Sequence, residues 1–238
     1  MIENLPGYIS ITFILTTFLT IGFLIHAVRK TVLQTTPAKI LITIIPFWLF
    51  FTATMALGGF YAFTGSAPPR VFLFGAFPAF LVIVFFFIFF RKNFVDRLPL
   101  RTLTLLSVIR IPVEIVLLWL FQQGAISRLM TFEGFNFDIL SGLSAPLIYW
   151  LAFRENKINR PLLIGWNIGA LILLIIIVSI AAVALPSPMQ QIAFDQPNRA
   201  VMYFPYIWLP AIVVPIVLFS HLVSLKQLLF SRSSSETG

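Results

Sequence analysis

Two oppositely charged residues, Arg110 and Glu114, lie four residues apart within an apolar stretch that runs from Leu100 to Phe121. In a helix, this spacing puts both side chains on one face, where they can neutralise each other. A charge at the centre of a bilayer costs roughly 2.5–3.5 kcal/mol on insertion scales, so such residues face protein or a wet cavity. The pair therefore suggests a ligand anchor, an ion gate or a proton relay. The structural alternative is a pair that only holds helices together.

The face that carries this pair continues with Ser107, three residues before Arg110. Pro112 falls between the two charges and removes one backbone hydrogen bond, which frees a carbonyl group for Arg110 or water. We expect Asp138 to reach Arg110 only through water or another side chain, or else to cap its own helix. A second stripe of small or polar residues is expected in that next helix, and it holds Asp138, Ser141, Gly142, Ala145 and Tyr149.

Polar residues also gather in two connections that are long enough to fold back over a helical bundle. Both connections mix carboxylates, amides and an arginine with apolar residues. This composition predicts an outward-facing vestibule or lid, the alternative being ordinary solvated loops. The polar residues concerned are Gln122, Gln123, Arg128, Glu133 and Asn136 in the first connection, and Asp195, Asn198 and Arg199 in the second.

The composition is that of an integral membrane protein. Of the 238 residues, 59% are hydrophobic and 10% are charged, whereas about a quarter of a soluble domain is charged. The absence of cysteine excludes disulfides, cysteine-ligated metals and thiol nucleophiles. The net charge is +8, but the basic residues are spread over short connections rather than gathered in a patch. We therefore expect the lipid bilayer, and not nucleic acid, as a partner.

Apolar stretches of the length that crosses a bilayer, about 20 residues, recur along the chain. We expect one all-α transmembrane domain over residues 1–230, followed by a disordered polar tail over residues 231–238. The seven predicted helices cover about 8–28, 40–63, 71–90, 101–122, 137–153, 161–185 and 205–229, and the fifth is the shortest. Because Glu3 rather than a basic residue precedes the first helix, we expect that helix to be retained.

The distribution of Lys and Arg predicts the orientation. Three of the 16 basic residues, Arg70, Arg128 and Arg199, lie in one set of alternate connections. By the positive-inside rule, the N-terminus is outside and the C-terminus is cytoplasmic, as in a multi-pass protein of the inner (plasma) membrane. The other set of connections holds 12 basic residues: Arg29, Lys30, Lys39, Arg91, Lys92, Arg97, Arg101, Arg154, Lys157, Arg160, Lys226 and Arg232.

Polar or small residues inside other helices have their own interpretations. His26 and His221 are the only histidines, and two histidines at one depth could ligate a haem. Capping or snorkelling is far commoner, so we expect no cofactor and no metal. Gly165 and Gly169 form a GxxxG motif, which predicts a close contact between two helices with Asn167 hydrogen-bonding across it.

Seven helices with an outside N-terminus resemble the layout of rhodopsins and G-protein-coupled receptors. The motifs of these families are absent. A retinal protein needs a lysine in the middle of its last helix, whereas Lys226 lies at the cytoplasmic end of that helix. The sequence Asp-Arg-Tyr does not follow the third helix, and Asn-Pro-x-x-Tyr does not occur in the seventh. Seven-helix hydrolases of the ceramidase and progestin-receptor-like group use three zinc-binding histidines, and this chain has two. The resemblance is one of layout.

The leading functional hypothesis is a membrane bundle with a polar cavity open to the outside, for transport, channel function or binding of a small molecule or ion. Arg110 would anchor an anionic group or set an electrostatic barrier, and Glu114 would tune it. The second hypothesis is a membrane enzyme whose acid–base groups or metal ligands are Glu114, Glu133, Asp138 and Asp195. The third hypothesis is a non-catalytic partner subunit whose charge pair fixes packing.

Overall fold

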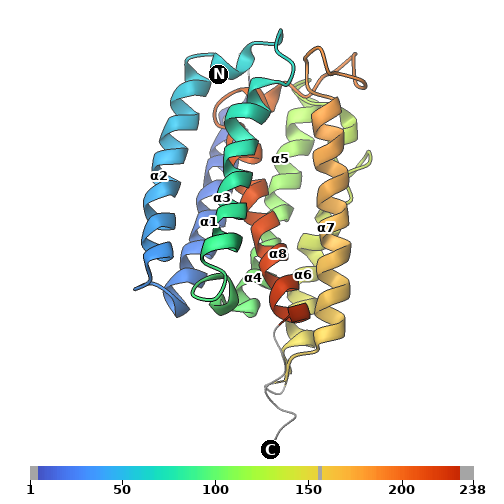
Figure 1. Cartoon of the computed structure of the whole chain (residues 1–238). Helices are drawn as coiled ribbons and strands as arrows, with labels where there is room; N and C mark the ends of the chain where they lie inside the picture. Colours follow the sequence, from blue (N-terminus) through green and yellow to red (C-terminus); the bar gives the residue numbers. More distant parts are fainter. Residues whose placement is uncertain (1–4, 155–156, 231–238) are drawn as a thin grey trace, which may run out of the picture.

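The computed structural model describes residues 5–154 and 157–230, and this part of the chain consists of helices and connections without a strand. Six helical segments are long and apolar enough to cross a membrane, which is consistent with the predicted multi-pass architecture (Figure 1). The predicted tail over residues 231–238 lies outside the described residues. The six segments are Gly7–Thr31 (α1), Thr36–Leu57 (α2), Phe72–Phe89, Leu100–Gln122, Arg160–Val183 (α7) and Leu209–Phe230.

A further apolar helix, α6 (Ile139–Ala152), has 14 residues. At 1.5 Å per residue it is about 21 Å long, which is less than the hydrocarbon thickness of about 30 Å. The expected number of seven membrane spans and the orientation of the two termini therefore stay predictions. Helix α1 begins and helix α8 (Val214–Phe230) ends at opposite ends of the bundle (Figure 1).

Helix α2 ends at Leu57, before the expected residue 63. Gly58 and Gly59 follow it, and Gly59 adopts a left-handed conformation with φ of 74°. A left-handed glycine commonly terminates a helix, because only glycine adopts this conformation without a steric penalty. A short 3-10 turn, Phe60–Ala62 (η1), then leads away from the helix axis.

The segment that carries Arg110 is not one continuous α-helix. It consists of α4 (Leu100–Leu106), a 3-10 turn η4 (Ser107–Ile109) and α5 (Arg110–Gln122). Pro112 has no N–H to donate to the carbonyl of Val108, so the turn before it tightens. In the most apolar stretch of 18 residues, 61% of this segment is buried, compared with 17% of α2. The segment α4–α5 therefore lies at the centre of the bundle.

Two π-helical turns face each other near the end of the bundle at which α1 begins. These turns are η2 (Phe72–Ala76), which continues into α3 (Phe77–Phe89), and η8 (Leu209–Val213), which continues into α8. Gly75 of η2 faces this contact, since an added Cβ would lie 3.5 Å from Cδ1 of Ile207 and 4.0 Å from Cβ of Ala211, which are ordinary packing distances. The hydroxyl of Tyr61 donates a hydrogen bond of 3.1 Å to the carbonyl of Phe74 within η2.

Candidate functional site

The buried Arg110 pairs with Asp138. Nη1 of Arg110 forms an ion pair with Oδ1 of Asp138 and lies 3.4 Å from the carbonyl of Ala170 in α7. Asp138 immediately precedes α6, yet its side chain makes no capping hydrogen bond to that helix. The expectation that Asp138 caps α6 or reaches Arg110 only through an intermediate group was therefore wrong. The loop before α6 folds further into the bundle than its sequence indicated.

A chain of hydrogen bonds links Arg110 to two other helices. Its Nη2 lies 2.9 Å from Nε2 of His221 in α8, and Nδ1 of His221 lies 2.8 Å from Oδ1 of Asn167 in α7. A guanidinium group has only donors, so Nε2 of His221 must accept and the proton must sit on Nδ1. Nδ2 of Asn167 donates to the carbonyl of Leu163 at 2.8 Å, which fixes the orientation of its amide. His221 is therefore neutral in this arrangement.

The same contacts bear on the haem interpretation. Both ring nitrogens of His221 are engaged, by Arg110 and by Asn167, whereas His26 is exposed on α1. An axial haem ligand needs a free ring nitrogen, and His221 has none in this arrangement. Among the residues that the structure describes, no group of three or more His, Cys, Asp or Glu could hold a metal ion.

Glu114 has a different partner from the one that its spacing suggested. Its Oε1 accepts a hydrogen bond of 2.6 Å from Nδ2 of Asn136, while its buried Oε2 has no hydrogen-bond partner. Asn136 also donates to the carbonyl of Met130 at 3.0 Å and accepts from the backbone N–H of Asp138 at 3.1 Å. Both ends of its side-chain amide are thus engaged, and Asn136 holds the connection between α5 and α6 against Glu114.

The cluster contains more acidic than basic groups. Arg110 and Glu114 are each 2% exposed and Asp138 is 5% exposed. With both carboxylates ionised and His221 neutral, one negative charge has no cation beside it, and an unpaired buried charge is strongly unfavourable. Other buried polar atoms on the elements that carry the cluster also have no hydrogen-bond partner, namely Oγ of Ser107, Oγ of Ser141 and Nε of Arg110.

A cavity of about 140 Å³ lies beside this cluster, among η2, α5, α7 and η8. Its wall is apolar apart from four polar residues, Glu114, Asn136, Asp138 and Asn198. Asn198 comes from the connection between α7 and α8 and is 0% exposed. Both its side-chain oxygen and its side-chain nitrogen have no hydrogen-bond partner. Glu114 and Asn198, which each carry buried side-chain atoms without a hydrogen-bond partner, therefore both line this cavity.

The two long polar connections are joined to each other above the cavity. Nε2 of Gln196 donates to the carbonyls of Phe121 and Ile126, at 2.9 and 2.6 Å. The backbone N–H of Arg199 donates to the carbonyl of Ala125 at 3.1 Å, and its Nη2 lies 3.2 Å from the carbonyl of Gly124. The connections thus form one cap at the end of the bundle at which α1 begins.

Several residues that the sequence singled out lie away from this cluster. Tyr149 is half-buried and its ring lies 5.6 Å from that of Phe153 at the other end of α6. The four carboxylates of the enzyme hypothesis are divided, since Glu133 and Asp195 are exposed while the other two are buried. The exposed residues of the predicted outer set are Gln122, Gln123, Arg128, Glu133, Asp195 and Arg199.

The two glycines of the GxxxG motif do not make the helix contact that the motif predicts. Gly165 and Gly169 are exposed, and a Cβ added at either would meet no atom within 4 Å. The predicted close helix contact at the GxxxG motif was therefore wrong within the described residues. The close approach is at Gly142 of α6, where a Cβ would lie 3.0 Å from Cγ1 and 3.2 Å from the backbone nitrogen of Ile111.

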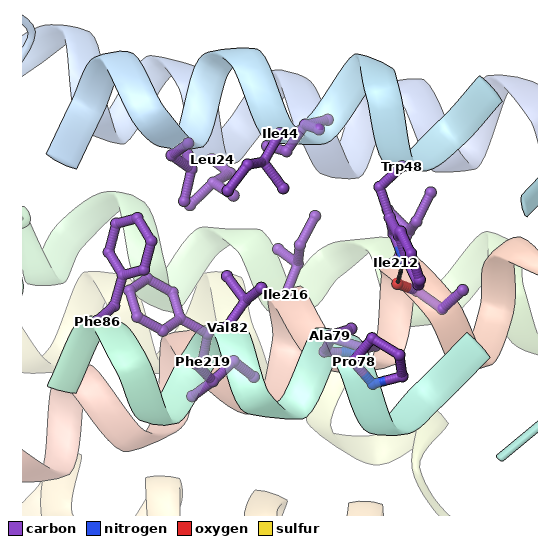
Figure 2. A pocket seen from close by; sticks show the side chains of 15 residues that line it. Leu24, Ile44, Trp48, Pro78, Ala79, Val82, Phe86, Ile212, Ile216 and Phe219 are labelled. Carbon is purple, nitrogen blue, oxygen red and sulfur yellow. Dashed lines mark hydrogen bonds between the residues drawn. The ribbon is translucent and has the colours of Figure 1, made fainter. Parts of the chain in front are cut away.

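A second cavity, of about 160 Å³, opens among α1, α2, α3 and α8. In Figure 2, Leu24 and Ile44 lie on one side of it, and Val82, Phe86 and Ile216 lie on the other. Its wall offers no free polar group, because the indole N–H of Trp48 donates to the carbonyl of Ala211 at 3.1 Å. We therefore place the candidate site at the polar cavity.

The fold and the cluster define a helical protein of membrane type with buried ionisable residues beside a cavity. The chain belongs to the family described as a domain of unknown function (DUF8737), whose model matches residues 68–229. The matched segment begins after α2 and contains every residue of the buried cluster and of the cavity wall. No curated protein and no solved structure matched the chain.

Proposed function

We propose that this protein binds a small ligand in the cavity beside Glu114 and serves its transport or its sensing across the membrane. The observation that carries the proposal is that two residues lining one cavity, Glu114 and Asn198, each keep buried side-chain polar atoms without a hydrogen-bond partner. A buried polar group without a partner costs roughly 1–3 kcal/mol. A protein that keeps two such groups at one cavity gains that free energy back when a ligand satisfies them.

The roles within the cluster differ from the hypothesis that Arg110 anchors an anion. Asp138 and His221 occupy both terminal nitrogens of Arg110, which leaves Glu114 and Asn198 as the groups that face a ligand. Arg110 in this proposal is a positioning residue. It holds the loop before α6 against α5 and thereby sets one wall of the cavity.

The proposal also accounts for the short α6. Non-helical backbone at membrane depth is tolerated only where protein buries it or where it lines a cavity. Asn136 and Asp138 precede α6, are buried and line the cavity, as in transporters that bind substrates at interrupted helices. We propose that this segment together with α6 completes a seventh crossing, with the capped end outside the inner membrane according to the positive-inside rule.

Native mass spectrometry of the full chain, purified in lipid nanodiscs, tests the proposal. We expect a small-molecule adduct on the wild-type protein that Asn198→Leu removes, since this substitution fills the cavity with an apolar group. Gln123→Leu, on the exposed part of the same cap, is the matched control and keeps the adduct. An adduct that both variants retain equally contradicts the proposal. A bare wild-type protein whose thermal stability no small molecule raises contradicts it as well.

A further inference from the structure

We infer that the ligand of this cavity is a small organic cation, an amine in its ammonium form with an apolar body of about the size of benzene. This inference rests on the proposed function and adds the chemical class of the ligand. It follows from three independent properties of the cavity: the charge balance of its wall, the hydrogen-bonding groups that it leaves open, and its size and apolar lining.

The charge balance favours a cation. Asp138 is neutralised by its ion pair with Arg110, and the hydrogen-bond pattern makes His221 neutral. Glu114 is bonded to the uncharged amide of Asn136, so its carboxylate has no cationic hydrogen-bond partner among the described residues. A cationic ligand would give an ionised Glu114 the charged hydrogen-bond partner that the described residues do not provide, whereas an anionic ligand would meet no cation on the cavity wall.

The open hydrogen-bonding groups fit an ammonium group. Oε2 of Glu114 and Oδ1 of Asn198 are acceptors without a donor, and an ammonium nitrogen carries several N–H donors. One ammonium group therefore carries enough donors for both oxygens, and Nδ2 of Asn198, which also has no partner, stays open as a donor. An alcohol has a single donor and could satisfy one of the two oxygens. The bond to Glu114 would be charge-assisted, which is the stronger kind.

The size and the lining favour an organic cation over a metal ion. The cavity of about 140 Å³ is close to an engineered apolar cavity of about 150 Å³ that binds benzene. Aliphatic side chains such as Leu117, Leu174 and Ile177 make up most of its wall. Calcium takes 6–8 oxygen ligands and magnesium about six, and this wall offers far fewer. An apolar body attached to the ammonium group would occupy the aliphatic part.

Isothermal titration calorimetry of the full chain in nanodiscs tests the inference with probes of one shape and different charge. The probes are benzylamine, benzyl alcohol and benzoate, with rubidium chloride as an inorganic cation. We expect benzylamine to bind about tenfold or more tightly than benzyl alcohol, as a charge-assisted hydrogen bond predicts, and we expect no binding of benzoate or rubidium.

Variants place the binding at the cavity. Glu114→Gln should weaken benzylamine binding about tenfold or more and leave the affinity for benzyl alcohol unchanged. Glu133→Gln, at an exposed carboxylate, is the matched control and should bind benzylamine as the wild type does. Asn198→Ala serves as a second variant if Glu114→Gln does not fold, because the side chain of Asn198 makes no hydrogen bond in the free protein. It should also weaken benzylamine binding.

The outcomes separate this inference from the proposed function. Equal affinity for benzylamine and benzyl alcohol, or binding of benzoate or rubidium in place of benzylamine, overturns the amine inference while the cavity still binds a ligand. Benzylamine binding that neither Glu114→Gln nor Asn198→Ala weakens also overturns it. If no probe binds and native mass spectrometry finds no adduct, the proposed function fails together with the inference.

Discussion

Arg110 and Asp138 are 28 residues apart in the chain and form a buried ion pair between the first residue of α5 and the residue before α6. Further hydrogen bonds extend this pair on both sides. Arg110 is linked through His221 to Asn167 in α7, while the backbone N–H of Asp138 donates to Asn136, whose amide nitrogen donates to Glu114. One network therefore connects three helices with the cap of the cavity.

The ion pair predicts a specific pattern of rescue. Asp138→Leu should destabilise the protein by about 3–5 kcal/mol, because it leaves the charge of Arg110 without its partner. The double variant Arg110→Leu with Asp138→Leu should recover most of that loss, because it leaves neither charge of the pair behind. Arg110→Leu with Glu114→Leu should stay destabilised, because Asp138 then remains buried without its cation. Chemical unfolding in detergent measures all three. Rescue by the second pair alone would contradict the assignment of Asp138 as the partner.

Asn136 is expected to order the connection between α5 and α6. Asn136→Ala removes its bonds to Glu114, to Met130 and to the backbone of Asp138, at a cost of about 1–3 kcal/mol. Hydrogen exchange over residues 128–138 should therefore rise. Gln123→Ala, in the exposed part of the same connection, should leave exchange unchanged. Equal exchange in the two variants would show that Asn136 does not hold this segment.

His221 is expected to be neutral and to carry its proton on Nδ1, because Arg110 can only donate to Nε2. Nitrogen-15 NMR of labelled histidine should show this tautomer for one of the two imidazoles. His221→Leu leaves Nη2 of Arg110 and Oδ1 of Asn167 without their hydrogen-bond partner and should cost about 1–3 kcal/mol. A signal from the Nε2–H tautomer at His221 would contradict the hydrogen-bond direction described above.

The glycines of α6 and α7 are expected to respond oppositely to alanine. Gly142→Ala forces a Cβ against the backbone of Ile111 and should lower the melting temperature. Gly165→Ala adds its methyl group in open space, so it should be neutral or stabilise by up to about 1 kcal/mol through helix propensity. Thermal melts of the two variants in one lipid composition provide the comparison. A larger loss at Gly165 would mean that the GxxxG face is packed after all.

Tyr61 is expected to stay protonated over the whole working range of pH. Burial raises the pKa of Tyr61 to about 12, so its hydroxyl keeps donating to the carbonyl of Phe74. Tyr61→Phe removes this bond and should cost about 1 kcal/mol. Ultraviolet titration of the wild type and the variant should differ only by a transition near the raised pKa. A lost transition near pH 10 would contradict the burial of this hydroxyl.

Composition and helix length predicted the helical membrane-type bundle, because both depend on local sequence. The polar residues of the cluster were also visible, since Arg110, Glu114 and Asp138 stand out within or next to apolar stretches. Their partners were not predictable in the same way. The spacing of Arg110 and Glu114 indicated a local pair, but Asp138 competes for Arg110 from another helix, and only the packing of α5 on α6 brings it there.

The roles of His221 and Gln196 were missed for a related reason. His221 was noticed as a polar residue in an apolar helix, but its contact with Arg110 depends on the positions of α8 and α5. Gln196 had no distinguishing pattern, and its two hydrogen bonds to the other connection depend on how both loops fold. The GxxxG motif, by contrast, predicted a close helix contact where the described residues show none. Small residues permit a close contact but do not create one.

The π turns η2 and η8 also have a consequence for how this family can vary in length. Each turn holds one residue more than an α-helical turn would, and one residue corresponds to a rotation of about 100°. Loss of a single residue from Phe72–Ala76 or Leu209–Val213 would therefore change the helical phase between the two sides of the turn. Side chains that now line the cavity would swing towards lipid. Relatives that keep the cavity should thus tolerate substitutions in these two segments but not single-residue deletions.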